Sequence, residues 1–330
     1  EHIERTFRRP TTEQILRTFL AWLLPNPRLF RIALIGAQLA RYFLFLMPKK
    51  LSTLLSLAPN KLPKRSRIDE PGIKPAKGAP KYRVALLAGC AQRVLDPEIN
   101  ESTIRLLTRH GCEVVISPGT GCCGAIPHHM GKTASTSTKA RANIEAWTKE
   151  LQGGGLDAIV SNTSGCGTML KDYGHIFRDD KIWSTHAAKV SDRVLDISEF
   201  LARLDISSPA PSNLSVAYHS ACSLQHGQQV HEAPKSLLEG CGFKVLEIPE
   251  GHLCCGSAGT YNLLQPTIAG NLRDRKLANI AAVAPDIIAA GNIGCITQLS
   301  SGTNTPVVHT VQLVDWATGG PKPKPLGSTA

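Results

Sequence analysis

From residue 83 onward, short apolar runs alternate with longer segments whose apolar residues recur at helical spacing. The apolar runs predict strands followed by turns, and the segments between them predict helices. In the first half, the predicted strands cover 84–87, 113–117, 157–160 and the start of 194–204, with helices at 97–109, at 140–151 and at the end of 194–204. In the second half, the same order recurs at 216–218, 243–248, 286–289 and 307–314.

Helices between successive strands imply right-handed crossovers and a mostly parallel sheet. The segment 194–201 also resembles 307–314 in pattern, so the two halves match at their ends as well. We therefore expect an α/β fold built from two tandem pseudo-repeats. Each is a small, mostly parallel sheet with flanking helices, and an α-helical segment precedes them.

The first 60 residues show helical periodicity without strands. A helix is predicted at 11–24, opened by a capping box from Thr11 and Gln14 and closed by Pro25. A second helix is predicted at 28–47, and its longest charge-free run, 32–40, is too short to span a membrane. Its apolar side carries Leu29, Ile32, Gly36, Leu39, Phe43 and Leu46, and its polar side carries Arg31, Gln38 and Arg41. This helix either packs on the rest of the protein or docks a basic amphipathic face on a partner or an anionic membrane surface.

These patterns divide the chain of 330 residues into five parts. We predict a basic amphipathic helical segment, a Pro/Lys-rich linker, two cysteine-rich domains and a tail. Their ranges are 1–60, 61–82, 83–205, 214–318 and 319–330, in that order. The chain begins with Glu1 and not with Met, so we expect a fragment or a processed product.

The net charge of +11 is confined to the amino-terminal quarter of the chain. Residues 1–82 contain 16 Lys and Arg against 5 Asp and Glu, whereas the rest contains 21 of each kind. The cysteine-bearing body is thus neutral, and no basic stripe there alternates with aromatic residues. We therefore expect no nucleic-acid partner.

Eight of the ten cysteines form two sets of four with nearly the same spacing. The sets are Cys90, Cys122, Cys123 and Cys166, and then Cys222, Cys254, Cys255 and Cys295. In both sets the adjacent pair begins 32 residues after the first cysteine, and each cysteine follows a predicted strand. Because the carboxyl ends of parallel strands meet at one edge of a sheet, we expect each set to converge there. We expect the other two, Cys112 and Cys241, to pack as small core residues.

Four soft sulfur ligands select either zinc or an iron–sulfur cluster. Structural zinc sites prefer Cys-x-x-Cys pairs, which neither set contains, so the residue types favour a cluster while zinc remains the alternative. Disulfides are disfavoured because the chain is large and because adjacent cysteines point to opposite sides of an extended backbone. Five histidines near the cysteines either tune clusters and relay protons or only hold the loops: His128, His129, His219, His226 and His252.

The repeated pattern of Cys, about thirty residues, Cys-Cys-Gly and a later Cys resembles the cysteine-rich CCG domain. That domain occurs twice in one of the subunits of heterodisulfide reductase and also in iron–sulfur subunits of membrane-linked flavin dehydrogenases. Within this superfamily, four motifs resemble the glycolate oxidase iron–sulfur subunit family, over residues 83 to about 316. They are Gly89-Cys90-Ala91-Gln92, Gly121-Cys122-Cys123-Gly124 with the following Ala125 to His129, His252-Leu253-Cys254-Cys255-Gly256 with the following Ser257 to Asn262, and Asn292-Ile293-Gly294-Cys295.

The resemblance implies an oxidoreductase subunit that transfers electrons and has no catalytic residues of its own. The eight cysteines would bind [4Fe-4S] clusters, one per repeat. A flavin-containing glycolate oxidase subunit would oxidise glycolate to glyoxylate, and electrons would pass through the clusters towards a quinone or another membrane acceptor. The implied location is cytoplasmic, peripheral on the cytoplasmic face of the inner membrane.

Two departures from the family pattern affect this expectation. Family members carry an amino-terminal ferredoxin-like domain with further cysteine runs. Every cysteine of this sequence lies at or beyond Cys90, so we expect that domain to be missing from it. The heterodisulfide reductase relative has a fifth cysteine per set, where this chain has Thr163 and Asn292, which favours an ordinary cube. The alternatives are an iron–sulfur subunit of a lactate or glycerol-3-phosphate dehydrogenase, a heterodisulfide reductase-like thiol–disulfide enzyme, or a zinc-bound scaffold.

Overall fold

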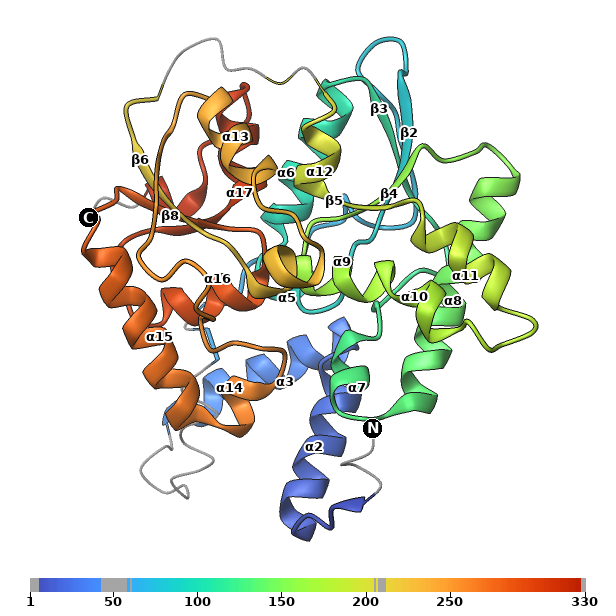
Figure 1. Cartoon of the computed structure of the whole chain (residues 1–330), viewed down its shortest axis with the longest axis horizontal. Coiled ribbons are helices and arrows are strands. Elements are labelled where there is room, and N and C mark those ends of the chain that lie inside the picture. The colour runs from blue at the N-terminus through green and yellow to red at the C-terminus, as the bar shows by residue number, and fades with distance from the viewer. Residues whose placement is uncertain (1–5, 43–57, 60, 205, 207–211, 328–330) are drawn as a thin grey trace.

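The computed structural model describes residues 6–42, 58–59, 61–204, 206 and 212–327, and it contains two sheets (Figure 1). The first sheet has the order β1 (Gly72–Lys74), β3 (Cys112–Ile116), β2 (Tyr82–Leu86), β4 (Ala158–Ser161) and β5 (Val194–Asp196). The second has the order β7 (Lys244–Leu246), β6 (Ser215–His219), β8 (Ile287–Ala290) and β9 (Val307–His309). All neighbouring strands are parallel except β1 and β3. The predicted fold class is confirmed.

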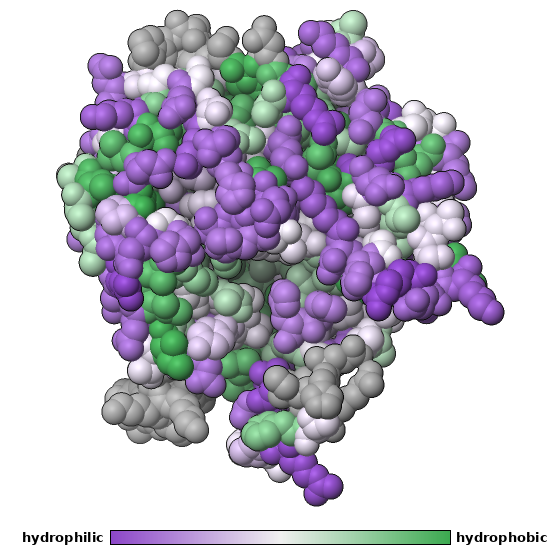
Figure 2. Space-filling view, in the orientation of Figure 1, coloured by the Kyte–Doolittle hydropathy of each residue, from purple (hydrophilic) through white to green (hydrophobic). Residues whose placement is uncertain are grey.

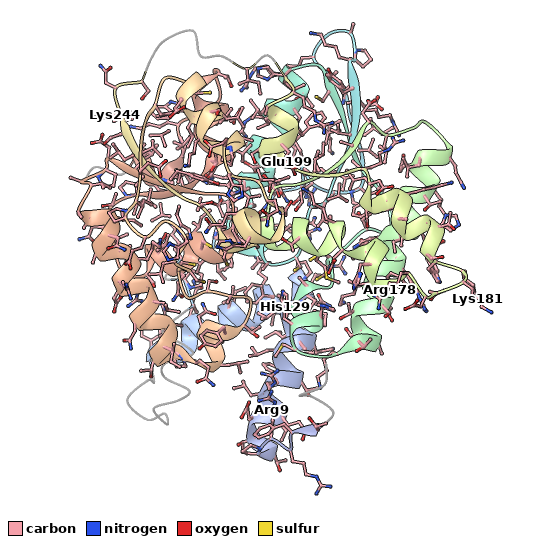
Figure 3. All side chains as sticks on the ribbon, in the orientation of Figure 1. Arg9, His129, Arg178, Lys181, Glu199 and Lys244 are labelled. Atoms are coloured by element: carbon pink, nitrogen blue, oxygen red, sulfur yellow. The ribbon has the colours of Figure 1, made fainter. Side chains whose placement is uncertain are left out.

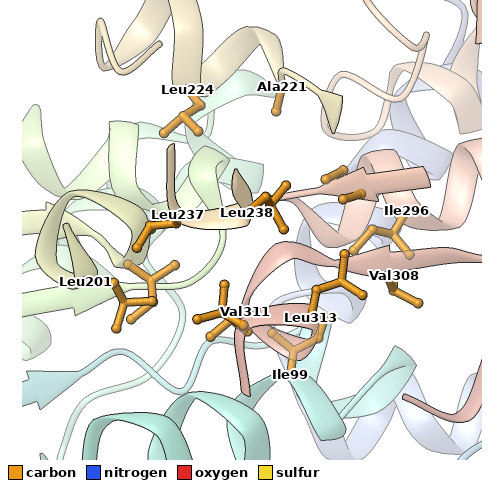
Figure 4. Close-up of a cluster of buried hydrophobic side chains, with 14 of the residues drawn as sticks. Ile99, Leu201, Ala221, Leu224, Leu237, Leu238, Ile296, Val308, Val311 and Leu313 are labelled. Carbon is orange, nitrogen blue, oxygen red and sulfur yellow. The ribbon is translucent and has the colours of Figure 1, made fainter. Parts of the chain in front are cut away.

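The two sheets share one hydrophobic core. Successive residues of β2 point to opposite faces, so that Val84 and Leu86 join this shared core while Ala85 and Leu87 face away from it. Four helices fill the space between the sheets: α6 (Glu98–Arg109), α12 (Ile197–Leu201), α13 (Ala233–Gly240) and α17 (Thr310–Ala317). Their leucines and isoleucines interdigitate in Figure 4. Buried Asp315 on α17 also pairs with Arg105 and Arg109 on α6, which links the two halves by charge.

The remaining helices cover the outer faces of the sheets and the loops at their carboxyl ends. In the first half they are α5 (Gln92–Leu95), α7 (Ala125–His129), α8 (Thr133–Gln152), α9 (Ser164–Lys171), α10 (Tyr173–Ile176) and α11 (Ser184–Ser191). In the second half they are the π-helix η2 (Ser223–Gly227), α14 (Tyr261–Leu264), α15 (Pro266–Ala281), α16 (Ile293–Ser300) and α18 (Lys324–Gly327). Most of the short helices were not predicted, because four to eight residues are too few to show a helical period.

The first two helices lie where predicted, but one begins differently. Helix α2 (Thr11–Leu23) has Pro10 at its N-cap, and no side chain caps it, so the predicted capping box from Thr11 is wrong. Pro10 suits this position because its carbonyl accepts the first helical hydrogen bond, from the Gln14 amide. Helix α3 (Pro27–Ala40) begins after Asn26, whose side chain accepts from two backbone amides. It ends at Ala40, and 43–47 of the predicted helix lie outside the described residues.

The predicted apolar side of α3 faces outward at several positions. Ile32 and Leu39 are 65% and 63% exposed, whereas Gln38 on the polar side donates to the Pro59 carbonyl at 3.2 Å. Arg31 and Arg41 likewise donate to the carbonyls of 63 and 58. The helix does pack on the protein, but through Phe30 and Leu34, while Arg31, Gln38 and Arg41 on its polar side donate to backbone carbonyls of 58, 59 and 63.

The predicted linker at 61–82 contains a strand. Gly72 pairs with Ile116 and Lys74 with Val114, so β1 extends the first sheet as an antiparallel edge strand. Three residues flanked by prolines carry almost no periodicity, which explains why the sequence did not predict this strand.

Exposed apolar side chains are concentrated in the amino-terminal helices. Of eleven exposed large hydrophobic residues in the described chain, eight lie in 7–42. By contrast, the face shown in Figure 2 is mostly hydrophilic, with apolar groups in small patches. Among the described residues, no helix is long and apolar enough to cross a membrane.

Candidate metal centres

The first cysteine set converges at the carboxyl edge of its sheet, as expected for parallel strands. Cys90 follows β2, the pair follows β3, and Cys166 lies in the first turn of α9 after β4. The Sγ atoms of Cys90 and Cys122 are 3.6 Å apart, and Cys123 lies within hydrogen-bonding reach of both Cys122 and Cys166. Figure 3 shows sulfur atoms gathered between α7 and α9.

The second set has the same layout. The Sγ atoms of Cys222 and Cys254 are 4.0 Å apart, and Cys255 interacts with Cys254 and Cys295. Cys295 lies in the first turn of α16, at the position that Cys166 has in α9. All eight predicted ligands are thus brought together in two groups, whose role as ligands remains a prediction.

A left-handed glycine shapes the loop after each cysteine pair. Gly124 has φ 90° and Gly256 has φ 87°, a backbone conformation that residues with a Cβ adopt at a cost. This turn directs backbone amides back at the sulfurs: the Gly124 amide lies 3.4 Å from Cys122 Sγ, and the Gly256 amide lies 3.3 Å from Cys254 Sγ. Such donors stabilise negative charge on a thiolate or on a bound cluster.

Hydrogen bonds among the thiols give the members of each set different pKa values. Bonds from Cys123 and Cys90 lower the pKa of Cys122, and bonds from Cys222 and Cys255 lower the pKa of Cys254. Each set therefore stabilises a thiolate at the first member of its adjacent pair, which is the form that binds metals.

The positions that replace a fifth cysteine serve as helix caps. Thr163 is the N-cap of α9 and its hydroxyl bonds to the Gln92 side chain, while Asn292 is the N-cap of α16 and accepts from the Gly294 amide at 3.1 Å. Four sulfurs per set are therefore available.

Four soft thiolates in each set suit either an iron–sulfur cluster or a zinc ion. A tetrahedral zinc ion with four thiolates keeps every pair of sulfurs roughly 3.8 Å apart. In the described chain, the group with three ligand atoms within 4.8 Å of one another is His219, Cys255 and Cys295. The Sγ separations of 3.6 Å in the first set and 4.0 Å in the second are close to that zinc value, so the sulfur spacing alone favours neither zinc nor a cluster.

His219 is the residue that the structure singles out among the five histidines. It ends β6, is 1% exposed, and neither ring nitrogen has a hydrogen-bond partner among the described residues. A buried imidazole N–H requires an acceptor, and the sulfur of a thiolate or of a cluster beside Cys255 and Cys295 would supply one. The other four, His128, His129, His226 and His252, are exposed.

Two buried polar side chains behind the cysteine pairs were not predicted. Lys276 on α15 is fully buried, and its Nζ donates to the Glu250 carbonyl at 2.7 Å. Burial lowers the pKa of Lys276, and charge on Cys255 opposes that shift. The burial of Lys276 could have been inferred from helical spacing, because Lys276 falls on the same face of α15 as buried Ala269 and Ile280.

Asn143 on α8 occupies the matching place in the first half. Its Oδ1 accepts from the Gly121 amide at 2.8 Å, and its Nδ2 donates to the Cys122 carbonyl at 3.1 Å. Tyr173 completes this support by donating to the Cys123 carbonyl at 2.6 Å. The first pair is therefore braced by neutral groups.

The two centres adjoin one another. The Ser164 and Ser223 hydroxyls, which lie beside Cys166 and Cys222 in the chain, are 2.7 Å apart. The Ser164 amide also donates to the Gly291 carbonyl at 3.0 Å, close to the loop of Cys295. The expected core role of Cys112 and Cys241 agrees with their place in the shared core, where burial raises the pKa of both to about 11.

Comparison with known proteins links this geometry to a family. The model of the CCG cysteine-rich domain matches residues 84–171 and 216–300. The glycolate oxidase iron-sulfur subunit of Escherichia coli K12 is 34% identical over 316 residues, which cover 96% of this chain and 74% of that protein. A probable glycolate oxidase iron-sulfur subunit of Bacillus subtilis is 31% identical, covering 78% of this chain and 58% of that protein. Lactate utilization protein A of Bacillus licheniformis is 27% identical, covering 66% and 90%.

Proposed function

The chain belongs to the CCG cysteine-rich domain family and to the glycolate oxidase iron-sulfur subunits, and we propose that it is the electron-transfer subunit of a glycolate-oxidising complex. The observation that carries this proposal is the convergence of four sulfurs at the carboxyl edge of each sheet. As in its relatives, the chemistry would be that of iron–sulfur clusters, which supply one-electron oxidation and reduction when bound.

In this proposal, each repeat holds one [4Fe-4S] cluster. The ligands are Cys90, Cys122, Cys123 and Cys166 in the first centre, and Cys222, Cys254, Cys255 and Cys295 in the second. The protein contributes thiolates, amide donors from the loops with left-handed glycines, and burial, which together determine how readily each cluster accepts an electron.

The proposed partner is a flavin-containing subunit that oxidises glycolate to glyoxylate, with a quinone or another membrane acceptor receiving the electrons. The similarity to glycolate oxidase subunits favours glycolate, while the similarity to lactate utilization protein A supports lactate as the second candidate. The flavin subunit that copurifies with the chain distinguishes the two.

A peripheral contact with the cytoplasmic face of the inner membrane is part of the same proposal. Exposed Phe19 and Trp22 on α2 and exposed Ile32 and Leu39 on α3 supply apolar groups, and the segment 14–68 contains ten Lys and Arg but no Asp or Glu. Such a surface suits an anionic bilayer interface. Flotation with anionic and with neutral liposomes tests it, and equal behaviour with both would contradict an electrostatic contact.

The proposed function is tested by measuring iron, acid-labile sulfide and zinc in anaerobically purified protein, followed by low-temperature EPR after dithionite reduction. Two [4Fe-4S] centres require about eight irons per chain with matching sulfide and a reduced-cluster signal. Stoichiometric zinc without an EPR signal would leave a duplicated structural scaffold and sink the electron-transfer function.

A further inference from the structure

Two matching positions differ in charge and in hydrogen-bonding capacity between the centres. Leu87 and His219 each lie three residues before the first cysteine of their set. The carbonyl groups of Thr136 on α8 and Ala269 on α15 face the left-handed glycines of the two halves. Asn143 lies seven residues after Thr136, and Lys276 lies seven residues after Ala269. The first centre thus has a leucine and an amide where the second has an imidazole and an ammonium group.

An ammonium group near a cluster favours its reduced form. Reduction adds one negative charge, and a buried positive charge stabilises it more strongly than water does, because the local dielectric constant is low. Lys276 is held in place by the carbonyls of Glu250 and Gly251, at 2.7 Å and 3.5 Å from Nζ. Cys254, Cys255 and Cys295 all act on it electrostatically. Asn143 is neutral and has no such effect.

Two other differences act in the same direction, whereas the charge of Lys139, which acts on Cys122 in the first centre, opposes them. The His219 ring lies beside Cys255 and Cys295 and offers an N–H that Leu87 lacks. Cys222 and Cys254 are half-buried, whereas in the first set only Cys166 is, so water also stabilises charge better at the second centre. Backbone donors do not reverse this difference, because the two sets have the same ones. In each set, both cysteines of the adjacent pair interact with the backbone amide two residues further along the chain.

We propose that the second centre is the higher-potential cluster of the pair, and that Lys276 and His219 raise its potential above that of the first. This inference rests on the proposed function. With clusters bound, this order of potentials would favour transfer of one electron from the first centre to the second, and that transfer makes or breaks no bond. The contact between Ser164 and Ser223 places the two centres next to each other for this step.

The experiment is an EPR-monitored redox titration of the full chain, as wild type and as Lys276→Gln. Gln keeps a donor for the Glu250 carbonyl but removes the charge, so we expect one of the two reduction waves to move to lower potential. The expected change in the reduction equilibrium constant is about tenfold, which equals about 59 mV for one electron. The wave that shifts in Lys276→Gln must be the one with the higher potential in the wild type. A shift confined to the lower wave, or no shift, would overturn the proposal.

Three further variants separate the charge from the fold. Lys276→Arg keeps the charge and should leave the wave within a fraction of that shift, while His219→Leu should lower the same wave. Lys244→Gln is the matched control and should move neither wave, because Lys244 is exposed at the amino-terminal end of β7, opposite the sheet edge that carries the cysteines, and lies far from His129 in Figure 3. Iron and sulfide content distinguishes the two failures: protein without clusters contradicts the proposed function, whereas two clusters with unshifted waves contradict only this inference.

Discussion

The two halves of the molecule have the same backbone design and different surroundings for their cysteines. In both sheets the strand before the first cysteine, β2 or β6, lies between the next two strands of its repeat. Both adjacent pairs are followed by a left-handed glycine, and both later cysteines lie in the first turn of a helix. Behind the sulfurs, the first half has Leu87 and Asn143 and the second has His219 and Lys276. The repeated backbone positions the ligands, and the side chains packed behind them tune each centre separately.

The glycine turns differ in how tightly they are packed. A Cβ added at Gly124 would lie 3.4 Å from the Thr136 carbonyl oxygen, an ordinary contact, whereas one added at Gly256 would lie 2.4 Å from the Ala269 carbonyl oxygen. Helix α15 therefore lies closer to its cysteine loop than α8 does. The second centre is the more tightly braced of the two, although its cysteines are more exposed.

The largest effect is expected from removing one ligand in each half. Cys255→Ser should empty the second centre and Cys123→Ser the first, so each variant loses half of the iron and sulfide and one reduction wave. Serine is a poor ligand for a cluster that prefers soft thiolates. Cys241→Ser is the control, because Cys241 lies in the shared core and the variant should keep all the iron.

These variants also test the order of potentials, since the wave that survives in Cys255→Ser should be the lower one. Loss of all iron in both variants would contradict independent centres. Full retention of iron would show that the substituted cysteine is not a ligand.

A smaller effect is expected from the two turns. Gly124→Ala and Gly256→Ala each place a Cβ at a left-handed residue, at a cost of about 1–2 kcal/mol. Only Gly256→Ala also overlaps a helix carbonyl, which adds about 1–3 kcal/mol. Anaerobic denaturant unfolding should therefore give a clearly larger loss of unfolding free energy for Gly256→Ala. Equal losses would contradict the difference in packing.

The smallest effect concerns the caps that end the last strand of each half. Asp196 caps α12 and His309 caps α17, each with a capping box, and both side chains are buried. Burial raises the pKa of Asp196 to about 6 and lowers the pKa of His309 to about 4. The neutral form of each group is therefore favoured in the folded state, and the two caps respond to pH in opposite directions.

The sign follows from each shift. The unfolded chain protonates histidine near pH 6.5, so His309 makes the folded state lose stability as pH falls from about 6.5 towards 4. Asp196 makes it lose stability as pH rises from about 4 through about 6. When the pH falls from 7 to 5, the free energy of unfolding of His309→Gln should decrease by about 2 kcal/mol less than that of the wild type. The free energy of unfolding of Asp196→Asn should decrease by about 1 kcal/mol more than that of the wild type. Unfolding free energies at both pH values test this, and parallel pH profiles for the two variants would refute it.

The sequence alone determined the element order, the duplication and the two groups of cysteines. Strand and helix periods of 2 and 3.6 residues can be read along the chain, and parallel strands with helical crossovers place every strand's carboxyl end at one edge. Cysteines that follow such strands must then meet at that edge. The convergence of 90, 122, 123 and 166 could therefore be predicted without knowing what surrounds them.

Only the tertiary structure decided which groups lie behind those cysteines and which faces are covered. Lys276 and Asn143 act on loops more than twenty residues away in the chain, and the outward side of α3 depends on the segment that covers Arg31 and Gln38. Strand β1 forms because β3 offers it a free edge. Local periodicity shows which face of a helix or strand is apolar. The segment that packs against that face is determined by contacts between residues far apart in the chain, which no local pattern encodes.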